Sequence, residues 1–585
     1  MLPKALKALT FVFILSPIHT LASVNKSQLF LVGGGLKTCS SMSLSQCTDK
    51  SFLSDRDKQH PLYRISAMQI EKLADIWPQN HLSRHREKVL SLLAKVQGKQ
   101  FSGDKNALRA ILKKHDKQGV IRQLADREYY LLLDSLEMPV QHNNGERKKE
   151  QVKLSQTRNV FNQEIFNKFV ALASSKNTNT DKRPNILVVT ASARDPYEAV
   201  DFYEQVFTQA GANVTWLPID AAVNRLWQEH GSSPTSCKLL SQYQLSALAT
   251  TNRAFVYPDR FSTQQTLCKQ PDEFVAMIEQ ADGLFINGGD QSLTKEAFKN
   301  KDGRDNAILK AIKTEVTNNS LIVGGTSAGT AVMSGGSDIA VMGETSAKTT
   351  PPMITNGRSE VALARGAKAD LLPNAGCAKD NQCSETLLQD DLTYNSKGGL
   401  SLFPYGVMDT HFSERGRQGR LMKLVQDTNA SFGFGVDEAT ALLVAPLTKD
   451  TVEMTVVGQG GVFITEPGNI KNSYITHYLT REDRAKLHNG KLTLAFAPWK
   501  NITELASTES QENQQIFEGL RYKQLAQHHC INNEQQYVAT SHWQAQHFNI
   551  TFSQTSAWTR AIGILKTQEV GQVYCSYQNL QVDIK

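Results

Sequence analysis

The stretch 321–333, Leu-Ile-Val-Gly-Gly-Thr-Ser-Ala-Gly-Thr-Ala-Val-Met, constrains the fold of this chain more than any other. Its apolar and β-branched start predicts a buried strand, and residues 325–329 then fit G-x-S-x-G where the strand would turn into a helix. Small residues on both sides of Ser327 let strand and helix pass closely. The pattern predicts a nucleophile elbow that presents the serine hydroxyl at the open end of a sheet. A glycine-rich loop with an ordinary serine is the alternative.

A series of alternating strands and helices precedes this stretch. Apolar runs predict strands at 29–32, 185–190, 214–219 and 283–287, and a helix is expected over 196–210. Such alternation is typical of an α/β fold with a mostly parallel sheet, flanking helices and an active site at the carboxyl ends of its strands.

Two regions depart from this pattern. From about residue 65 to 173 apolar residues recur at helical spacing, as in Ile70, Leu73 and Trp77, which predicts a helical insertion over about 60–177. Residues 468–585 alternate polar and apolar side chains in short runs and predict a small β-rich C-terminal region. The catalytic α/β domain is therefore expected over 23–467.

The first residues resemble a secretory signal. Lys4 and Lys7 precede an apolar run over 8–15, and small residues end at Ala22. A signal peptide over 1–22, cleaved near Ala22, predicts a soluble protein that is secreted or periplasmic. A membrane anchor is the alternative, but the apolar run is far shorter than the ~20 residues that span a bilayer, and no later segment is long and apolar enough to span one.

The cysteines agree with export. There are eight, and they fall as close neighbours along the chain. Four local disulfides are the simplest interpretation, although eight cysteines allow about 105 pairings. A zinc site is disfavoured, because the chain has no C-x-x-C spacing and exported thiols are usually oxidised. The expected pairs are Cys39–Cys47, Cys237–Cys268, Cys377–Cys383 and Cys530–Cys575.

Composition excludes one class of partner. A formal net charge of +7 is small for 585 residues, and lysine and arginine are dispersed along the chain. Nucleic acid is therefore not expected as the main partner. The 40% hydrophobic content is enough for a sizeable core in two to four domains.

A serine nucleophile needs a base, and the base needs an orienting carboxylate. His411 follows a predicted strand at 400–407, and Asp437 and Glu438 follow another at 432–436. Ser327, His411 and one of these carboxylates would then lie on one rim of the sheet. The alternatives are a structural histidine and a solvated loop carboxylate.

Four blocks together resemble the cyanophycinase family: G-G-D-Q at 288–291, G-T-S-A-G at 325–329, D-x-H-F-x-x-R-G-R-x-x-R at 409–420 and V-D-E-A-T-A at 436–441. These are serine peptidases related to aspartyl dipeptidases, with a sheet similar to that of class I glutamine amidotransferases. The resemblance covers 29–35 and about 185–464, and it excludes the helical insertion and the C-terminal region.

The resemblance implies a role for each matching residue. Ser327 would be the nucleophile, His411 its base and Glu438 the orienting acid. Backbone N–H groups of Gly289 and Ala328 would form the oxyanion hole. This mechanism requires no metal and no organic cofactor.

The family's substrate is cyanophycin, a polyaspartate that carries arginine on each β-carboxyl and is cut to β-aspartyl-arginine dipeptides. The arginines of the third block could pair with substrate carboxylates, and Asp409 could meet a guanidinium or fix one of these arginines. A helix face with ion pairs to Glu414 and its neighbours is the alternative. The implied substrate contacts are Gln291, Asp409, Thr410, Arg415, Arg417 and Arg420.

One residue departs from the family. Thr410 stands where the family commonly has glutamine, so a substrate hydrogen bond could be lost or replaced. The expected partner is a polypeptide, either cyanophycin or another aspartyl peptide. A catalytically silent polymer-binding protein is the rival from a different class, and the sequence leaves a homodimer open.

Overall fold

The computed structural model describes residues 28–77, 85–177, 182–336, 350–373, 377, 383–503, 505, 513–567 and 570–585. The expected signal peptide, residues 1–22, lies outside the described residues. None of the helices in the described part of the chain combines the length and apolar character that a membrane crossing requires.

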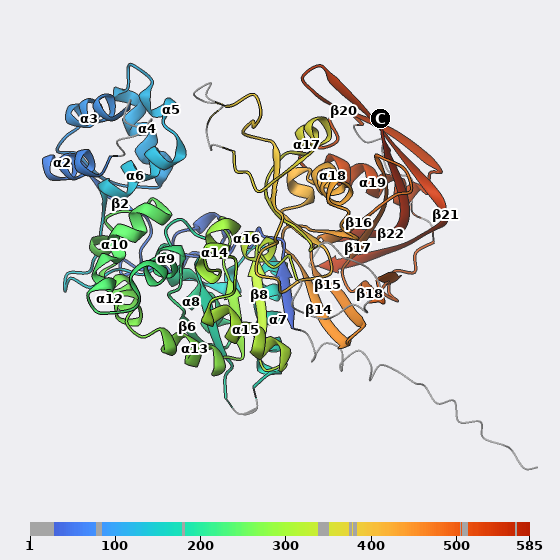
Figure 1. Cartoon of the computed structure of the whole chain (residues 1–585), viewed down its shortest axis with the longest axis horizontal. Coiled ribbons are helices and arrows are strands. Elements are labelled where there is room, and N and C mark those ends of the chain that lie inside the picture. The colour runs from blue at the N-terminus through green and yellow to red at the C-terminus, as the bar shows by residue number, and fades with distance from the viewer. Residues whose placement is uncertain are drawn as a thin grey trace, which may run out of the picture.

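A nine-stranded sheet forms the centre of the molecule, in the order β19-β18-β15-β14-β1-β8-β7-β5-β6 (Figure 1). The expected parallel sheet is confirmed for five neighbouring strands. These are β1 (Leu29–Val32), β5 (Asn185–Val189), β6 (Asn213–Trp216), β7 (Gly283–Ile286) and β8 (Ile322–Thr326). All except the edge strand β6 are mostly apolar and buried, because helices cover both faces. Beyond β1 the sheet continues in antiparallel pairing through β14 (Thr440–Thr448), β15 (Thr451–Gly458), β18 (Arg484–His488) and β19 (Lys491–Ala495).

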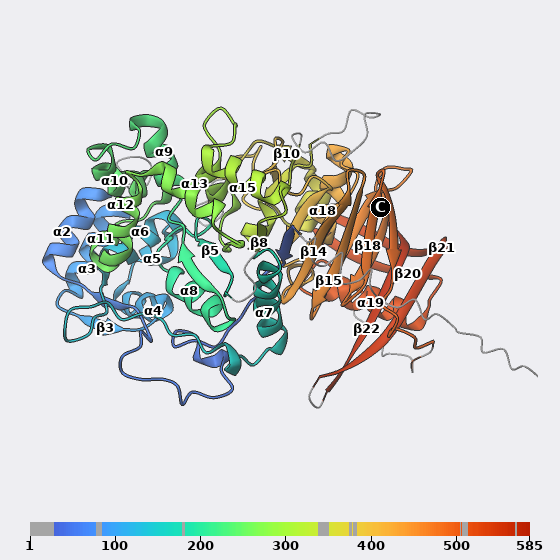
Figure 2. The same ribbon diagram turned by 90° about the horizontal axis from the view of Figure 1, so that it is seen from below.

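Helices pack on both faces of the parallel strands (Figure 2). On one face, Phe169 of α7 and Phe207 of α8 meet Phe285 of β7 with ring centroids 5.2 and 5.0 Å apart. On the other, Leu226 of α9 and Phe274 of α13 belong to the larger core cluster. The helices of this part are α7 (Val160–Ser174), α8 (Val200–Gln209), α9 (Ala221–His230), α10 (Leu240–Tyr243), α11 (Arg253–Val256), α12 (Pro258–Leu267), α13 (Pro271–Glu279), α14 (Gln291–Phe298), α15 (Ala307–Thr317) and α16 (Ala328–Ala331).

A second, seven-stranded sheet lies beside the first, in the order β12-β13-β16-β17-β22-β21-β20. The residues after 468 are rich in strand, as expected, but the pairing of β16 with β17 crosses the proposed boundary at residue 467. Three helices, α17 (Ser359–Arg365), α18 (Gln418–Thr428) and α19 (Arg521–Asn532), share a core with this sheet. Its strands are β12 (Val407–Thr410), β13 (Gly433–Val436), β16 (Gly461–Pro467), β17 (Ser473–Thr480), β20 (Gln536–Trp543), β21 (Gln546–Thr567) and β22 (Val570–Ile584).

Two sequence predictions about the strands that precede the candidate catalytic residues are wrong. Residues 400–405 are not a strand, because Leu400 and Phe403 donate their N–H groups to the carbonyls of the loop after α16. The three candidate catalytic residues also do not share one sheet: β8 belongs to the first sheet, whereas β12 and β13 belong to the second. The site therefore lies where the two sheets meet.

The segment 346–399, which precedes β12, also contains regular structure. Its described residues form α17 and a small three-stranded sheet of β9 (Met353–Asn356), β10 (Ala367–Ala369) and β11 (Leu392–Asn395). The strands are too short to show an alternating pattern in the sequence.

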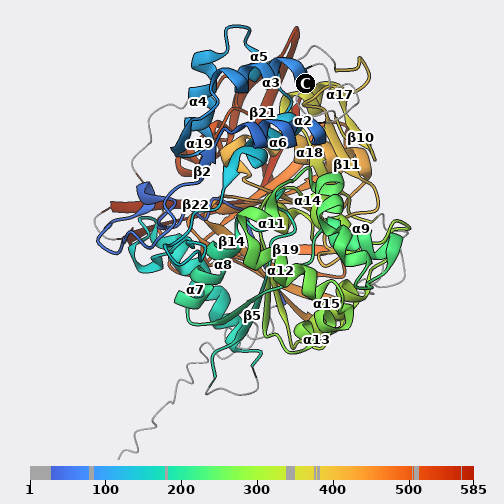
Figure 3. The same cartoon turned by 90° about the vertical axis from the view of Figure 1, so that its left-hand side faces the viewer.

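The helical insertion has its own hydrophobic core over Tyr63–Leu136. It lies at the upper left of Figure 1 and at the top of Figure 3, away from β20–β22. Helix α7, which falls within the proposed insertion, instead packs on the central sheet. The elements of the insertion are β2 (Leu62–Arg64), α2 (Ala67–Ile76), α3 (Arg86–Lys95), β3 (Gln100–Ser102), α4 (Lys105–His115), α5 (Val120–Gln123), α6 (Asp126–Leu136) and β4 (Glu137–Met138).

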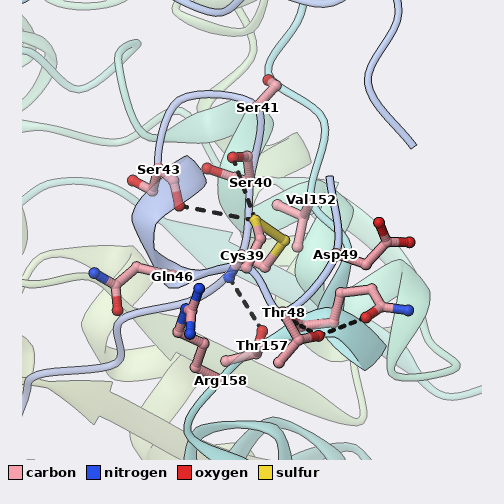
Figure 4. Close-up of a disulfide and its surroundings, with 12 residues drawn as sticks. Cys39, Ser40, Ser41, Ser43, Gln46, Thr48, Asp49, Val152, Thr157 and Arg158 are labelled. Carbon is pink, nitrogen blue, oxygen red and sulfur yellow. Dashed lines mark hydrogen bonds between the residues drawn. A yellow bond between two sulfur atoms is a disulfide. The ribbon is translucent and has the colours of Figure 1, made fainter. Parts of the chain in front are cut away.

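All eight cysteines are paired, in the four local disulfides expected from the sequence. Figure 4 shows the first of them, Cys39–Cys47, in the loop after β1. There the N–H group of Cys39 donates to the hydroxyl of Thr157 at 3.1 Å, which ties this loop to the segment before α7.

Candidate active site

Ser327 occupies the tight turn between β8 and α16, with φ at +54°. Its N–H group donates to the carbonyl of Val32 on β1 at 3.1 Å. A Cβ on Gly325 would lie 2.3 Å from the carbonyl oxygen of Gly329, and one on Gly329 would lie 2.4 Å from that of Ile286. Glycine is therefore required on both sides of this serine, which gives a physical reason for the spacing in the sequence.

His411 follows β12 and is held against the glycine turn after β1. The backbone N–H group of His411 donates to the carbonyl of Gly33 at 2.7 Å. A Cβ on Gly34 would lie 2.4 Å from the imidazole ring. Nε2 of the ring lies 2.7 Å from Ser327 Oγ, and Nδ1 lies 2.7 Å from Glu438 Oε1. With its proton on Nδ1, the ring donates to Glu438 and accepts from the serine hydroxyl.

Of the two carboxylates that the sequence left open, Glu438 is the one at His411. The neighbouring Asp437 is fully buried and accepts a hydrogen bond from the hydroxyl of Tyr478 at 2.6 Å. The short link between β13 and β14, which carries both residues, connects the second sheet to the first.

Burial lowers the pKa of His411 below its ordinary value, and Arg415 and Arg417 nearby act in the same direction. The hydrogen bond to Glu438 opposes them but does not outweigh them. The imidazole is therefore neutral at neutral pH, the state in which Nε2 can accept a proton.

The turn after β7 lies against Ser327. A Cβ on Gly288 would lie 3.1 Å from the Cβ of Ser327, and one on Gly289, at φ +151°, would lie 2.0 Å from the carbonyl oxygen of Ser192. Ala328 is the first residue of α16, where backbone N–H groups have no acceptor within the helix. Gly289 and Ala328 line the same cavity as Ser327.

Two cavities meet at Ser327 and His411. One, of about 360 Å³, is lined among others by Asp195, Glu198 and Tyr203. The other, of about 320 Å³, is lined by every residue that the sequence implied as a substrate contact: Gln291, Asp409, Thr410, Arg415, Arg417 and Arg420. The serine hydroxyl thus lies between a wall that carries Asp195 and Glu198 and a wall with guanidinium groups, which also carries Asp290 and Asp409.

Asp409 holds two of the arginines. Its carboxylate is 2% exposed and pairs with Arg420 through two hydrogen bonds, one from Nε at 2.8 Å and one from a terminal nitrogen at 2.5 Å, and with Arg417 at 3.2 Å. Burial alone would raise the pKa of Asp409, but the positive charges of Arg420 and Arg417 outweigh it and lower that pKa. Arg415 is exposed, and among the described residues no carboxylate forms an ion pair with it.

Gln291 and Thr410 are also fixed by the protein. The side-chain amide of Gln291 donates to the carbonyl of Ile354 on β9 at 2.6 Å. Thr410 is buried, and its carbonyl accepts a hydrogen bond from Arg417 at 2.5 Å. Both residues therefore shape the wall with the guanidinium groups.

Sequence reasoning missed several groups at the site. The backbone of Gly33 holds His411, and Glu414 accepts the N–H group of Glu438 at 3.1 Å. The glycine run at 33–35 predicts a tight turn beside an active site, but it does not predict the contact with His411. For Glu414 the sequence offers no signal, because the contact depends on how two loops meet. In the described part of the chain, no three or more His, Cys, Asp or Glu side chains gather in a way that could hold a metal ion.

No protein-family model matches this chain. It is 27% identical over 217 residues to the cyanophycinase of Trichormus variabilis, which is 37% of this chain and 55% of that protein. It is 27% identical over 209 residues to the cyanophycinase of Synechococcus elongatus, 36% of this chain and 49% of that protein. The chain thus spans about half the length of the curated relatives it matches.

One solved structure with some similarity is that of a peptidase from an acI-B1 Actinobacterium, with a TM-score of 0.29 and 16% sequence identity over 54% of this chain and 88% of the other.

Proposed function

We propose that this protein is an exported serine-type peptidase of the cyanophycinase kind, with Ser327 as nucleophile, His411 as base and Glu438 as orienting acid. The observation that carries the proposal is the pair of 2.7 Å contacts that link Ser327 Oγ, the two ring nitrogens of His411 and Glu438 Oε1. The turn at Ser327 is accordingly proposed as a nucleophile elbow. Partial similarity to cyanophycinases supports the same assignment.

The reaction would proceed through an acyl-enzyme. Ser327 Oγ attacks the scissile carbonyl carbon while His411 Nε2 takes the hydroxyl proton, and Glu438 stabilises the imidazolium that forms. Backbone N–H groups of Gly289 and Ala328 would donate to the oxyanion, at about 3 kcal/mol of transition-state stabilisation for each well-placed donor. His411 then gives the proton to the leaving amine. Water repeats the sequence on the ester, which releases the acid and restores Ser327.

The substrate we propose is cyanophycin, cut to β-aspartyl-arginine dipeptides. Its carboxylate and guanidinium groups alternate, and the two cavities beside Ser327 carry guanidinium groups on one wall and carboxylates on the other. Arg415 is the proposed direct contact to a substrate carboxylate, because it is exposed and unpaired among the described residues. Asp409 is proposed to hold Arg417 and Arg420 in place, since both its oxygens already bind these side chains.

Export is part of the proposal. Four disulfides are typical of an oxidising compartment outside the cytoplasm. Together with the signal-like sequence over 1–22, they support a secreted or periplasmic protein.

The test is to incubate the purified mature protein with insoluble cyanophycin and to identify soluble products by mass. We expect β-aspartyl-arginine from the wild type and from Ser292→Ala, which removes a serine lining the same cavity, and none from Ser327→Ala. Cleavage of ordinary aspartyl peptides without release from cyanophycin would favour a peptidase of different specificity. Binding of the polymer without any cleavage would favour a silent binding protein.

A further inference from the structure

The carboxylate of Asp437, next to the proposed catalytic Glu438, lies in a buried pocket with several donors. It is 0% exposed and accepts hydrogen bonds from the N–H groups of Ser413 and Gly461 and from the hydroxyl of Tyr478, at 3.1, 3.2 and 2.6 Å. These donors are neutral. A fully buried carboxylate also needs a counter-charge, because an unpaired charge away from water is costly.

The counter-charge comes from the C-terminal region. Lys523 of α19 places Nζ 2.9 Å from Asp437 Oδ2, and the described residues offer Asp437 no other ion pair. The same ammonium lies 5.6 Å from the centre of the Tyr478 ring. Within the described part of the chain, helix α19 thus supplies the cation that pairs with the residue beside Glu438.

The charge of Lys523 also acts on a second carboxylate, that of Glu414. Oε2 of Glu414 accepts the backbone N–H group of Glu438 at 3.1 Å. The pKa of Glu414 is raised to about 7, because burial and the negative charge of Asp437 together outweigh the opposing positive charge of Lys523. Two carboxylates with one ammonium therefore surround the backbone of Glu438.

The C-terminal region also touches the loop after His411. A Cβ on Gly416 would lie 1.8 Å from the carbonyl oxygen of Phe517, so the two backbones are in close contact. Tyr522, next to Lys523, is buried, and its ring centre lies 5.9 Å from that of Phe463 on β16. These contacts fix where α19 begins and so where Lys523 points.

We infer that Lys523 is a positioning residue for the proposed reaction, so that the C-terminal region completes the catalytic site. By pairing with Asp437 and offsetting the negative charge beside Glu414, it holds the backbone of Glu438 where the carboxylate of that residue meets Nδ1 of His411. This inference rests on the proposed function, because it concerns the same three side chains.

The test compares rates of Ser327 labelling by a fluorophosphonate in full-length variants whose folding is checked by circular dichroism. Lys523→Met should label roughly 10- to 100-fold more slowly, the scale of loss when a catalytic group moves by about 1 Å. Lys523→Arg keeps the charge and should recover most of the rate. Arg521→Met is the control. It removes from the same helix a cation whose partner is Glu518, and this variant should be labelled at the wild-type rate. In peptide hydrolysis, Lys523→Met should lower kcat and leave KM nearly unchanged.

The outcomes separate this inference from the proposed function. A wild-type protein that is not labelled at Ser327 and hydrolyses no peptide would end the proposed function itself. If the wild type is labelled at Ser327 and folded Lys523→Met is labelled at the same rate, the positioning role alone is overturned. If Lys523→Met does not fold, Lys523→Gln replaces it, because glutamine keeps a hydrogen-bond donor for Asp437 without the charge. A Lys523→Gln variant that is labelled at the same rate as the wild type would also overturn the inference.

Discussion

Three residues around the candidate site have a positive φ without being glycine. Ser327 has φ at +54°, His411 at +46° and Ala439 at +50°. Such conformations cost of order 1–3 kcal/mol each and persist only where the surroundings enforce them. Here the backbone N–H groups of the three residues donate to the carbonyls of Val32, Gly33 and Gly34, respectively. Strain therefore gathers where the proposed nucleophile and base are positioned.

The pH dependence of Ser327 labelling follows from His411. Its pKa is lowered by burial, with Glu438 opposing and Arg415 and Arg417 adding to the fall. The reactive, neutral form is therefore present at neutral pH and is lost as pH falls through a pKa below about 6.5. Labelling rates measured from pH 4 to 9 should rise to a plateau with a midpoint below that value. A midpoint above it would contradict the burial of the imidazole.

Removal of the Asp409 carboxylate should destabilise the fold. In Asp409→Ala the guanidinium groups of Arg420 and Arg417 lose their buried partner, which costs about 3–5 kcal/mol of the free energy of unfolding. Chemical denaturation measures this loss. Asp302→Ala, whose partner Arg304 is exposed, should change the midpoint little and serves as the control. Equal effects of the two variants would contradict the buried ion pairs.

Among the elements, the sequence predicts best those with continuous apolar runs. β1, β5 and β7 begin and end within a residue of the predicted ranges, because buried parallel strands carry an unbroken apolar pattern. β12 was predicted too early, since residues 400–405 are equally apolar but pair with the loop after α16. The sequence also gives no sign that β12 and β13 belong to a second sheet, because pairing partners such as β22 lie far away in the chain.

The disulfides should differ in their effect on stability. Cys530–Cys575 joins α19 to β22 across 45 residues, whereas Cys377 and Cys383 are 6 residues apart. By loop-closure entropy, replacing the first pair with alanine should cost up to about 4 kcal/mol and replacing the second about 2 kcal/mol. Unfolding free energies of the two double variants test this order, and a larger loss for the shorter loop would contradict it.

In the whole molecule, a buried ion-pair network joins the helical insertion to the cleft that the two cavities form at Ser327. Arg253 is 1% exposed on its side chain and pairs with Glu137 at 2.9 Å and Asp195 at 2.6 Å. Arg194 pairs with Asp134 of α6 at 2.8 Å. Asp195 lines one of the two cavities at Ser327, so the insertion supports a wall of the cleft. The sequence could not predict this, because the partners lie 58 to 116 residues apart.

Arg253→Met should therefore affect both stability and the cleft. It leaves the carboxylates of Glu137 and Asp195 buried without their cation, at a cost of about 3–5 kcal/mol. Thermal and chemical denaturation measure the loss. Arg225→Met, whose partner Glu296 is more exposed, is the control and should behave nearly as wild type. An unfolding free energy close to that of wild type for Arg253→Met would contradict the network's role.

The central claim is that Ser327 is a nucleophile activated by His411. The most direct measurement is peptide mass spectrometry of the mature protein after reaction with a fluorophosphonate. The account predicts a single adduct on Ser327 in the wild type, its loss in Ser327→Ala, and formation at least about 100-fold slower in His411→Ala, because general-base assistance is removed. No adduct on the folded wild type, or an adduct on Ser327 that forms as fast without His411, would contradict it.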